Sequence, residues 1–140
     1  MAVHVLAVLA YKDGDHVTSS LLASSVNTNP VVVRRLLLSL QAARLVETRK
    51  GGTGGGTRLS RSPGRIHLAD VYRAVEAEEA FTMPRSKPNA ECPVGQCIQA
   101  ELRKVFFSVQ HALERELGKT TLGDVLAAVK ACCSTEPSQA

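Results

Sequence analysis

Hydrophobic positions recur at helical spacing along most of this chain. Residues 1–10 are almost entirely apolar and predict a buried first helix. The polar run YKDGDH at 11–16 predicts a turn. Thr18 is a good N-cap for a short helix over 19–26, and we expect Leu21, Leu22 and Val26 on its inner face.

A second helix is expected directly afterwards. Asn29 followed by Pro30 predicts an N-cap and a first helical position, and the helix should run to about Arg44. Its predicted inner face consists of Val33, Leu36, Leu37, Leu40 and Ala43. Two helices joined by a short polar turn match the helix-turn-helix pattern. Many small helical bundles contain the same corner, so this pattern alone does not establish DNA binding.

The next segment predicts a β-hairpin, or wing. Residues 45–48 are β-prone, and a glycine-rich run, GGTGGG, occupies 51–56 before a second β-prone stretch. Arg49 and Lys50 precede the glycines and Arg58 follows them. Glycines allow close approach to DNA, and basic side chains are attracted to a narrow minor groove. A nucleotide-binding loop is disfavoured because no Lys-Ser/Thr pair follows the last glycine. A plain flexible linker is the other alternative.

The second half of the chain is again helical. After Pro63-Gly64, a helix is expected over 68–79, with Leu68, Val71, Tyr72 and Val75 on one face. A loop is expected over 81–93, because that stretch is polar and contains prolines. A long helix should follow at about 94–117, then a final helix over 122–132 capped by Thr121.

The long helix carries an apolar seam close to a heptad repeat. So long a helix has few partners left in its own chain, and a second copy is the natural one. The residues expected at the dimer interface are Ile98, Leu102, Val105, Phe106, Val109 and Leu113, and Leu117 extends the seam.

These elements predict a mainly α fold with a small β-hairpin wing. We expect a winged helix-turn-helix DNA-binding domain over 1–80, a loop over 81–93, a dimerisation helix and C-terminal helix over 94–132, and a disordered tail over 133–140.

The charge is unevenly distributed. Residues 1–75 carry ten Lys and Arg against four Asp and Glu, whereas residues 76–140 carry seven against nine. Residues 31–73 alone carry nine basic and two acidic residues. A basic first half is typical of a polyanion-binding module, although an uneven solvated surface would look the same.

Other function classes find little support. No apolar run approaches ~18 residues, so we expect no membrane span, and the chain lacks a signal peptide's basic start and cleavage site. We therefore expect a cytoplasmic protein with reduced cysteines. No catalytic triad, carboxylate pair or cofactor fingerprint is present, so an enzyme is not expected. The four histidines, at 4, 16, 67 and 111, lack metal-ligand spacing, and we interpret His67 as a capping or surface residue.

The run LLASSVNTNPVVVRRLLLSLQAARLVETRKGGTGGGTRLSRSPGRIHLADVYRAVE resembles the BadM/Rrf-type family of bacterial winged-helix transcription regulators. The segment CPVG at 92–95, opening the long helix, resembles the subgroup without an iron–sulfur cluster, and TTLGDVLAAV near the end also fits. The resemblance covers residues 1 to about 130. Relative to the family pattern, the first helix begins almost at Met1, and the wing has one more residue before its last three glycines.

The resemblance implies a homodimer that binds double-stranded DNA at a roughly palindromic operator, and we expect a repressor. The helix that starts at Pro30 would enter the major groove, and the wing would enter the minor groove. The expected DNA contacts are Ser19, Ser20, Thr28, Asn29, Val31, Val32, Arg34, Arg35, Arg49, Lys50 and Arg58. The alternatives are core packing for the two valines and a solvated face for Arg34 and Arg35.

Two of the four cysteines are candidates for a redox sensor. Cys92 and Cys97 have C-x₄-C spacing, and Cys132 and Cys133 are adjacent beyond the long helix. This spacing gives no reason to expect an iron–sulfur cluster or zinc, so we expect no cofactor. Cys92 at a helix start could become a sulfenic acid that Cys97 resolves as a disulfide. The alternative is that both thiols are incidental.

The sequence is compatible with three hypotheses. The first is a DNA-binding regulator, with or without a thiol switch at Cys92 and Cys97. The second is a regulator that senses an iron–sulfur cluster or a small molecule. The third is a winged-helix scaffold that regulates an enzyme partner, which the basic wing disfavours because a scaffold has no need of Arg49, Lys50 and Arg58.

Overall fold

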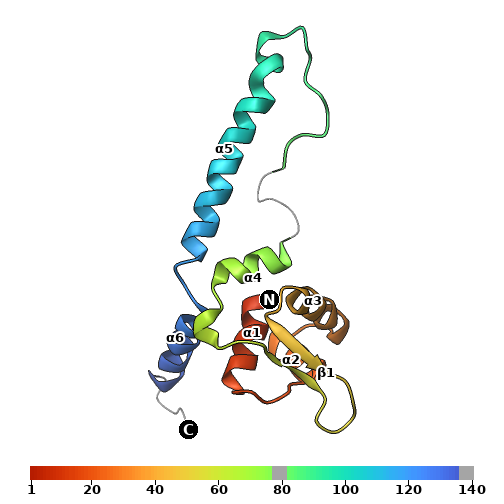
Figure 1. The fold of residues 1–140 in the computed structure, drawn as a ribbon, viewed down its shortest axis with the longest axis vertical. Coiled ribbons are helices and arrows are strands. Elements are labelled where there is room, and N and C mark those ends of the chain that lie inside the picture. Colours follow the sequence, from red (N-terminus) through yellow and green to blue (C-terminus); the bar gives the residue numbers. More distant parts are fainter. Residues whose placement is uncertain (77–81, 136–140) are drawn as a thin grey trace.

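The computed structural model describes residues 1–76 and 82–135. Its elements in chain order are α1 (Ala2–Tyr11), α2 (Ser19–Val26), α3 (Pro30–Ala42), β1 (Val46–Arg49), β2 (Gly56–Leu59), the 3₁₀ turn η1 (Pro63–Arg65), α4 (Leu68–Val75), α5 (Pro93–Leu117) and α6 (Leu122–Thr135). All elements except α5 gather into one body, and α5 projects from it as an arm (Figure 1). The predicted mainly α fold with a β-hairpin wing is confirmed.

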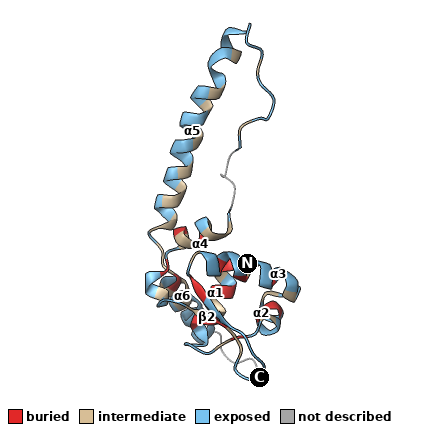
Figure 2. Cartoon of the chain, turned by 45° about the vertical axis from the view of Figure 1, so that its right-hand side comes forward, coloured by how far each residue is buried: buried red, intermediate tan, exposed pale blue. Residues whose placement is uncertain are grey.

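The body is organised around one apolar core. Fully buried side chains come from every part of it: Leu6, Leu9, Leu22, Leu40, Leu45, Ile66 and Leu122. The buried residues in Figure 2 accordingly lie in the body and not along the arm. The predicted burial of the first helix is also confirmed, since one face of α1 lines this core.

The first helix of the helix-turn-helix pair, α2, begins where its cap predicted. The Thr18 hydroxyl oxygen accepts a hydrogen bond from the Leu21 amide at 3.2 Å. Leu22 is completely buried and Val26 packs against the core, but Leu21 is 49% exposed. The prediction for Leu21 is therefore wrong. Adjacent helical positions point about 100° apart, so burying Leu22 and Ala23 turns Leu21 outward.

The second helix of the pair, α3, has the predicted cap and the predicted inner face. The Asn29 side-chain oxygen accepts from the Val31 amide at 2.8 Å, and Pro30 occupies the first turn. Val33 and Leu40 are fully buried. The helix ends at Ala42 rather than near Arg44, because Arg44 adopts a left-handed φ of 58°.

The wing is an antiparallel hairpin in which Val46 pairs with Leu59 and Arg49 pairs with Gly56. Backbone hydrogen bonds of 2.9 and 2.8 Å between Val17 and Thr57 tie the hairpin to the segment before α2. Gly56 has φ of 142°, and a Cβ there would lie 2.7 Å from the Val17 carbonyl oxygen. Only glycine therefore allows this junction, which sets the angle between the wing and the helices.

The fourth helix is shorter than predicted. Residues Leu68–Val75 form α4, and Glu76 already has extended backbone angles. The prediction that the helix continues to Glu79 is therefore wrong at Glu76. Residues 77–81 lie outside the described residues. Residues 82–92 contain neither helix nor strand, in agreement with the predicted loop.

The last helix, α6, packs on the body. Leu122 is fully buried and its amide donates to the Ile66 carbonyl at 2.7 Å. The predicted division at 94–132 groups α6 with the long helix, whereas the structure packs it against α1 and η1. The helix also continues to Thr135, so the disordered tail predicted over 133–140 is wrong for 133–135. Residues 136–140 lie outside the described residues.

Candidate DNA-binding surface

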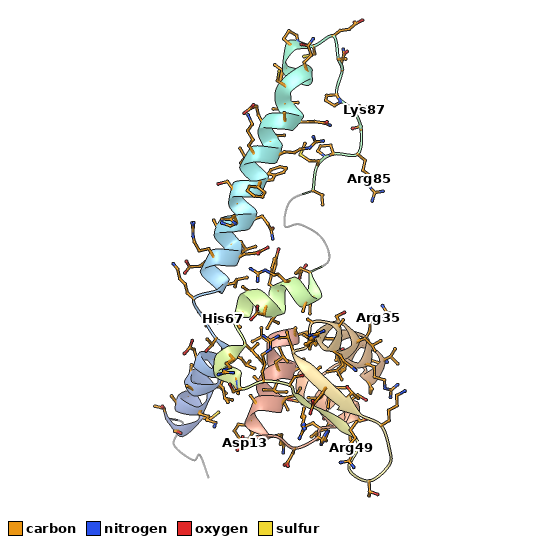
Figure 3. All side chains as sticks on the ribbon, in the orientation of Figure 1. Asp13, Arg35, Arg49, His67, Arg85 and Lys87 are labelled. Atoms are coloured by element: carbon orange, nitrogen blue, oxygen red, sulfur yellow. The ribbon has the colours of Figure 1, made fainter. Side chains whose placement is uncertain are left out.

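The outer face of α3 carries two arginines and the exposed apolar side chains of Val31, Val32 and Leu38. Val31 is 57% exposed and Val32 is 44% exposed, so core packing, the alternative for these valines, is wrong. Arg34 and Arg35 are exposed on the same side of the helix. Figure 3 shows Arg35 at the outer edge of α3. The face therefore offers guanidinium donors beside apolar surface, which is the combination that reads base edges and thymine methyl groups.

The turn before α3 is shaped by asparagines. Asn27 adopts a left-handed φ of 56° and ends α2, and Thr28 is half-buried between the helices. The side-chain oxygen of Asn29 is engaged in capping α3, which leaves its amide hydrogens for other contacts. Of these predicted DNA contacts, Asn29 thus has a structural role of its own.

The start of α2 lies beside α3. The Arg34 guanidinium Nε donates to the Ser19 hydroxyl oxygen at 3.3 Å. Ser19 is half-buried, Ser20 is exposed, and no acidic residue occupies the first turn of α2. Amides at a helix start, a serine hydroxyl and an arginine together form an anion-binding arrangement.

Two of the three predicted basic wing residues lie at its tip. Arg49, labelled in Figure 3, ends β1 and is exposed. Lys50 opens the glycine loop and is also exposed. Arg58 instead lies in β2, directly opposite Glu47, and its guanidinium forms an ion pair with that carboxylate. Arg58 therefore follows the glycine loop, as predicted, but lies in the strand and not in the loop itself. Its charge is already balanced by a cross-strand neighbour.

A groove of about 560 Å³ separates α3 from the wing. Arg34, Leu38 and Gln41 of α3 line one wall, and Arg49, Lys50 and the loop glycines line the other. Arg34, Arg49 and Lys50, which were predicted from two separate stretches of sequence, thus border one groove, whereas Arg35 does not line it. The groove has no acidic lining residue among those the structure describes.

Leu38 and Gln41 are surface residues that the sequence-based prediction missed. Leu38 is 69% exposed on α3 and follows Arg34 by four positions, so both lie on the outer face. One feature of the sequence could have identified Leu38: it is a large apolar residue that falls outside the buried pattern of Val33, Leu37 and Leu40.

The arm carries an apolar stripe that is largely exposed among the residues the structure describes. None of the 25 residues of α5 is buried. Val94, Ile98, Val105 and Val109 are exposed and recur at helical spacing, with half-buried Leu102 between them. Phe106 differs from the other predicted interface residues, because it lines a pocket with Met83 of the preceding loop. Leu113 is half-buried near the body.

The base of the arm is held to the body by polar contacts. The Arg73 guanidinium Nε on α4 donates to the Glu114 carboxylate at 2.9 Å, and the Gln110 amide donates to the other oxygen at 3.1 Å. Both contacts lower the pKa of Glu114, and the hydrogen bond from Gln110 has the larger effect. His67 contributes through its ring, whose Nδ1–H donates to the Gly118 carbonyl at 2.9 Å. The prediction of a capping or surface role is therefore incomplete: His67 also connects α4 to the end of α5.

The four cysteines are free and exposed. Cys92 is the N-cap residue of α5, and its side chain makes no capping hydrogen bond. Cys97 lies five residues further, where ideal helix geometry gives a Cα–Cα separation of about 8–9 Å. A disulfide needs less than about 7 Å, so bridging these two cysteines requires the first turn of α5 to open.

These observations define a class of protein: a winged helix-turn-helix chain with a basic groove between α3 and its wing, and with a projecting helix. The comparisons with known proteins give the family. A family model described as "Rrf2: Iron-dependent Transcriptional regulator" matches residues 1–128, and the chain belongs to this Rrf2 family of transcriptional regulators. The resemblance seen in the sequence is thereby confirmed, and the protein is a regulator and not an enzyme.

Individual relatives agree with this assignment. The chain is 40% identical over 126 residues to "Putative HTH-type transcriptional regulator YwnA" of Bacillus subtilis (strain 168), covering 90% of this chain and 92% of that protein. It is 39% identical to the crystal structure of a "putative DNA binding protein", with a TM-score of 0.71 and coverage of 89% and 95%. CymR, described as the global cysteine regulator of B. subtilis, is 21% identical over 91% of both chains with a TM-score of 0.66, which shows a shared fold.

The family description names iron, but the residues of this chain do not fit an iron–sulfur cluster. Such a cluster takes four ligands close together. Cys92 and Cys97 lie at the outer end of α5, whereas Cys132 and Cys133 lie on α6 in the body (Figure 1). Within residues 1–76 and 82–135, no three His, Cys, Asp or Glu side chains are grouped to hold a metal ion. The same residues include no helix long and apolar enough to cross a membrane.

Proposed function

We propose that this regulator binds double-stranded DNA as a homodimer, with α3 in the major groove and the wing in the adjacent minor groove. The observation that carries the proposal is the groove shared by Arg34 on α3 and by Arg49 and Lys50 on the wing. In a duplex, one sugar-phosphate strand separates the two grooves. A groove with basic walls and glycines is suited to straddle that strand.

The residues divide into two roles. Val31, Arg35 and Leu38, exposed on α3, are suited to contact base edges, because guanidinium donors and apolar surface discriminate bases. Ser19 at the start of α2 and Arg34 on α3 are together suited to hold a phosphate. A phosphate contact positions the protein on the duplex but carries no sequence information. Arg49 and Lys50 are suited to the minor groove. Arg58, paired with Glu47, contributes little.

The homodimer is supported by the bare stripe of α5. A 25-residue helix is about 37 Å long, and an apolar stripe of that length is unstable in water unless covered. A second α5 offers the same stripe, so the contact is self-complementary about a two-fold axis. A two-fold dimer of winged helices would read two half-sites about one helical turn apart, which matches a palindromic operator.

The experiment is selection of a duplex from a randomised library by the full-length protein, followed by affinity measurements across a range of salt concentrations. Arg35→Ala should weaken binding to the selected duplex about 10- to 100-fold and relax its base preference. Lys50→Ala should weaken binding to all duplexes alike and lower the salt slope by about 0.9.

Arg115→Ala is the matched control, because Arg115 is an exposed arginine on α5 and should leave affinity unchanged. Arg58→Ala should also have little effect because Glu47 already balances it. Wild-type affinity in both Arg35→Ala and Lys50→Ala would refute this surface as the DNA interface.

The exposed thiol at the start of α5 favours a second candidate, namely that oxidation of Cys92 controls DNA binding. Peroxide would convert the Cys92 thiolate to a sulfenic acid, and attack by the Cys97 thiol would form a disulfide and release water. Because the disulfide requires the first turn of α5 to open, oxidation would disturb the dimer helix. Cys92→Ser should abolish a peroxide-induced loss of DNA binding, whereas Cys132→Ser should preserve it. An equal peroxide response in wild type and Cys92→Ser would refute this candidate.

A further inference from the structure

A second pocket lies on the arm, on the side of α5 that faces the preceding loop. It has a volume of about 570 Å³ and is lined by Met83, Arg103, Lys104, Phe106, Phe107 and Gln110. This volume is within the range of about 300–1,000 Å³ typical of small-molecule sites. Ideal helical spacing puts the pocket residues of α5 on a different side from Ile98 and Val105, so a dimer through the bare stripe leaves the pocket open.

The lining combines apolar surface with positive charge. Met83, Phe106 and Phe107 supply a thioether and two aromatic rings, and Phe107 is 75% exposed. Arg103 and Lys104 supply cations, and no acidic residue lines the pocket among the described residues. Exposed aromatic surface is unfavourable in water, and a neighbouring cation attracts an anion, so this lining favours an amphipathic anion.

The two cations are not equivalent. The Lys104 ammonium already pairs with the Glu101 carboxylate at 2.8 Å, one turn earlier on α5. Arg103 has no ion-pair partner among the described residues. Its planar guanidinium can accept a carboxylate in a bidentate pair. Arg103 is therefore the residue expected to recognise the charged end of a ligand.

The wall formed by the loop is held by few contacts. The Gln96 side-chain amide donates to the Ala90 carbonyl at 2.8 Å, and that of Gln99 donates to the Ser86 carbonyl at 3.5 Å. The loop also carries Arg85 and Lys87, and Figure 3 shows both beside the upper half of α5. The loop thus adds positive charge near the pocket and can adjust to an occupant at small cost.

From this lining we infer that the pocket binds a small organic anion with an apolar body, of the aromatic or medium-chain carboxylate class. The carboxylate would pair with Arg103, and the apolar body would lie against Met83, Phe106 and Phe107. Gln110 at the pocket also donates to the Tyr72 hydroxyl on α4 at 3.5 Å, so an occupant would touch the connection between arm and body. Binding itself requires no DNA, so it can be tested apart from the proposed function.

The test is calorimetric titration of the full-length protein with 2-naphthoate and with octanoate, each compared with its neutral primary amide. We expect the acids to bind at least about tenfold more tightly than the amides, because a charge-assisted pair between a carboxylate and a guanidinium is stronger than a hydrogen bond to a neutral amide. Arg103→Gln should remove this preference. Arg115→Gln, at an exposed arginine on the same helix but outside the pocket, should retain it.

Three outcomes would overturn the inference. The first is absence of binding by either acid, and the second is equal binding of acid and amide. The third is a pocket already filled by a second copy of the chain. For the third, acrylamide quenching of the Phe107→Trp variant is measured across protein concentrations that span the dimerisation equilibrium. Quenching that falls as the dimer forms would show that the second copy covers the pocket. Quenching that does not change with protein concentration, but falls when 2-naphthoate is added, would support the site.

Discussion

The body buries side chains such as Leu6, Leu40 and Leu122 completely, whereas the 25 residues of α5 contain none that is buried (Figure 2). The body therefore satisfies its hydrophobic residues within one chain, and the arm does not. Apolar residues at helical spacing occur in both regions, so the pattern alone does not tell an internal core from an interface. What separates them is whether other elements of the same chain can reach the apolar face.

The strongest way to test this comparison is to disturb the body at α6. Leu122→Ala removes a fully buried side chain and should lower the free energy of unfolding by about 2–5 kcal/mol. Val129→Ala, on an exposed position of the same helix, should cost far less. Urea unfolding followed by circular dichroism gives both values. Equal effects would mean that α6 is not part of the body's core.

The corresponding test for the arm is Val105→Asp. Val105 is 55% exposed in the single chain, so an aspartate there should leave the body folded. In a dimer joined through the stripe, the carboxylate would be buried without a partner. We therefore expect the dissociation constant of the dimer to rise about 100-fold or more. Sedimentation equilibrium measures the effect.

Ala100→Asp is the control for that experiment, because Ala100 is exposed on the opposite side of α5 by helical spacing. An unchanged monomer–dimer equilibrium in Val105→Asp would show that the stripe is not the dimer interface. A shift of equal size in both variants would point to a general effect of added charge.

The smallest expected effect concerns the junction between arm and body at low pH. Asp124 accepts a hydrogen bond from the Thr121 amide at 2.8 Å, and its own amide donates to the Thr121 hydroxyl at 3.1 Å. Thr121 holds the pKa of Asp124 below its ordinary value. A lowered pKa in the folded state contributes stability above the unfolded value of about 3.9, and this contribution is lost as pH falls through the folded pKa.

Asp124→Asn should therefore be slightly less stable than wild type near neutral pH, and the two should converge as the pH falls through the lowered folded-state pKa of Asp124. Thermal unfolding at several pH values measures this convergence. Asp15→Asn, in the exposed turn after α1, removes the same charge without an α6 cap and should show no such convergence. If the difference in stability between Asp124→Asn and wild type stayed constant with pH, the charge of Asp124 would contribute nothing to the cap.

Much of the local structure followed from the sequence because its causes are local. Thr18 and Asn29 cap the helices they were expected to cap, since a cap bond spans two or three residues. The inner face of α3 was predicted correctly because one periodic pattern covers the whole helix. The short helix α2 offered less than three turns of pattern, and Leu21 was assigned to the wrong side.

The candidate DNA surface was predicted only in part. Arg34, Arg35, Arg49 and Lys50 were found because a basic run stands out in the sequence. That Arg34 borders one groove with Arg49 and Lys50 depends on the junction of Val17, Gly56 and Thr57, which sets the angle of the wing. The ion pair of Arg58 with Glu47 was not predicted, because it follows from the strand register of the hairpin.

The sequence by itself determined the class of the protein, through helix spacing, capping residues, the glycine-rich wing and the excess of positive charge before residue 75. Only the tertiary structure decided which apolar faces meet. It packed α6 onto the body, left the stripe of α5 bare, and turned Phe106 toward the loop to form a pocket beside Arg103. The physical reason is that local patterns arise from neighbours in the chain, whereas burial depends on contacts between residues far apart in sequence.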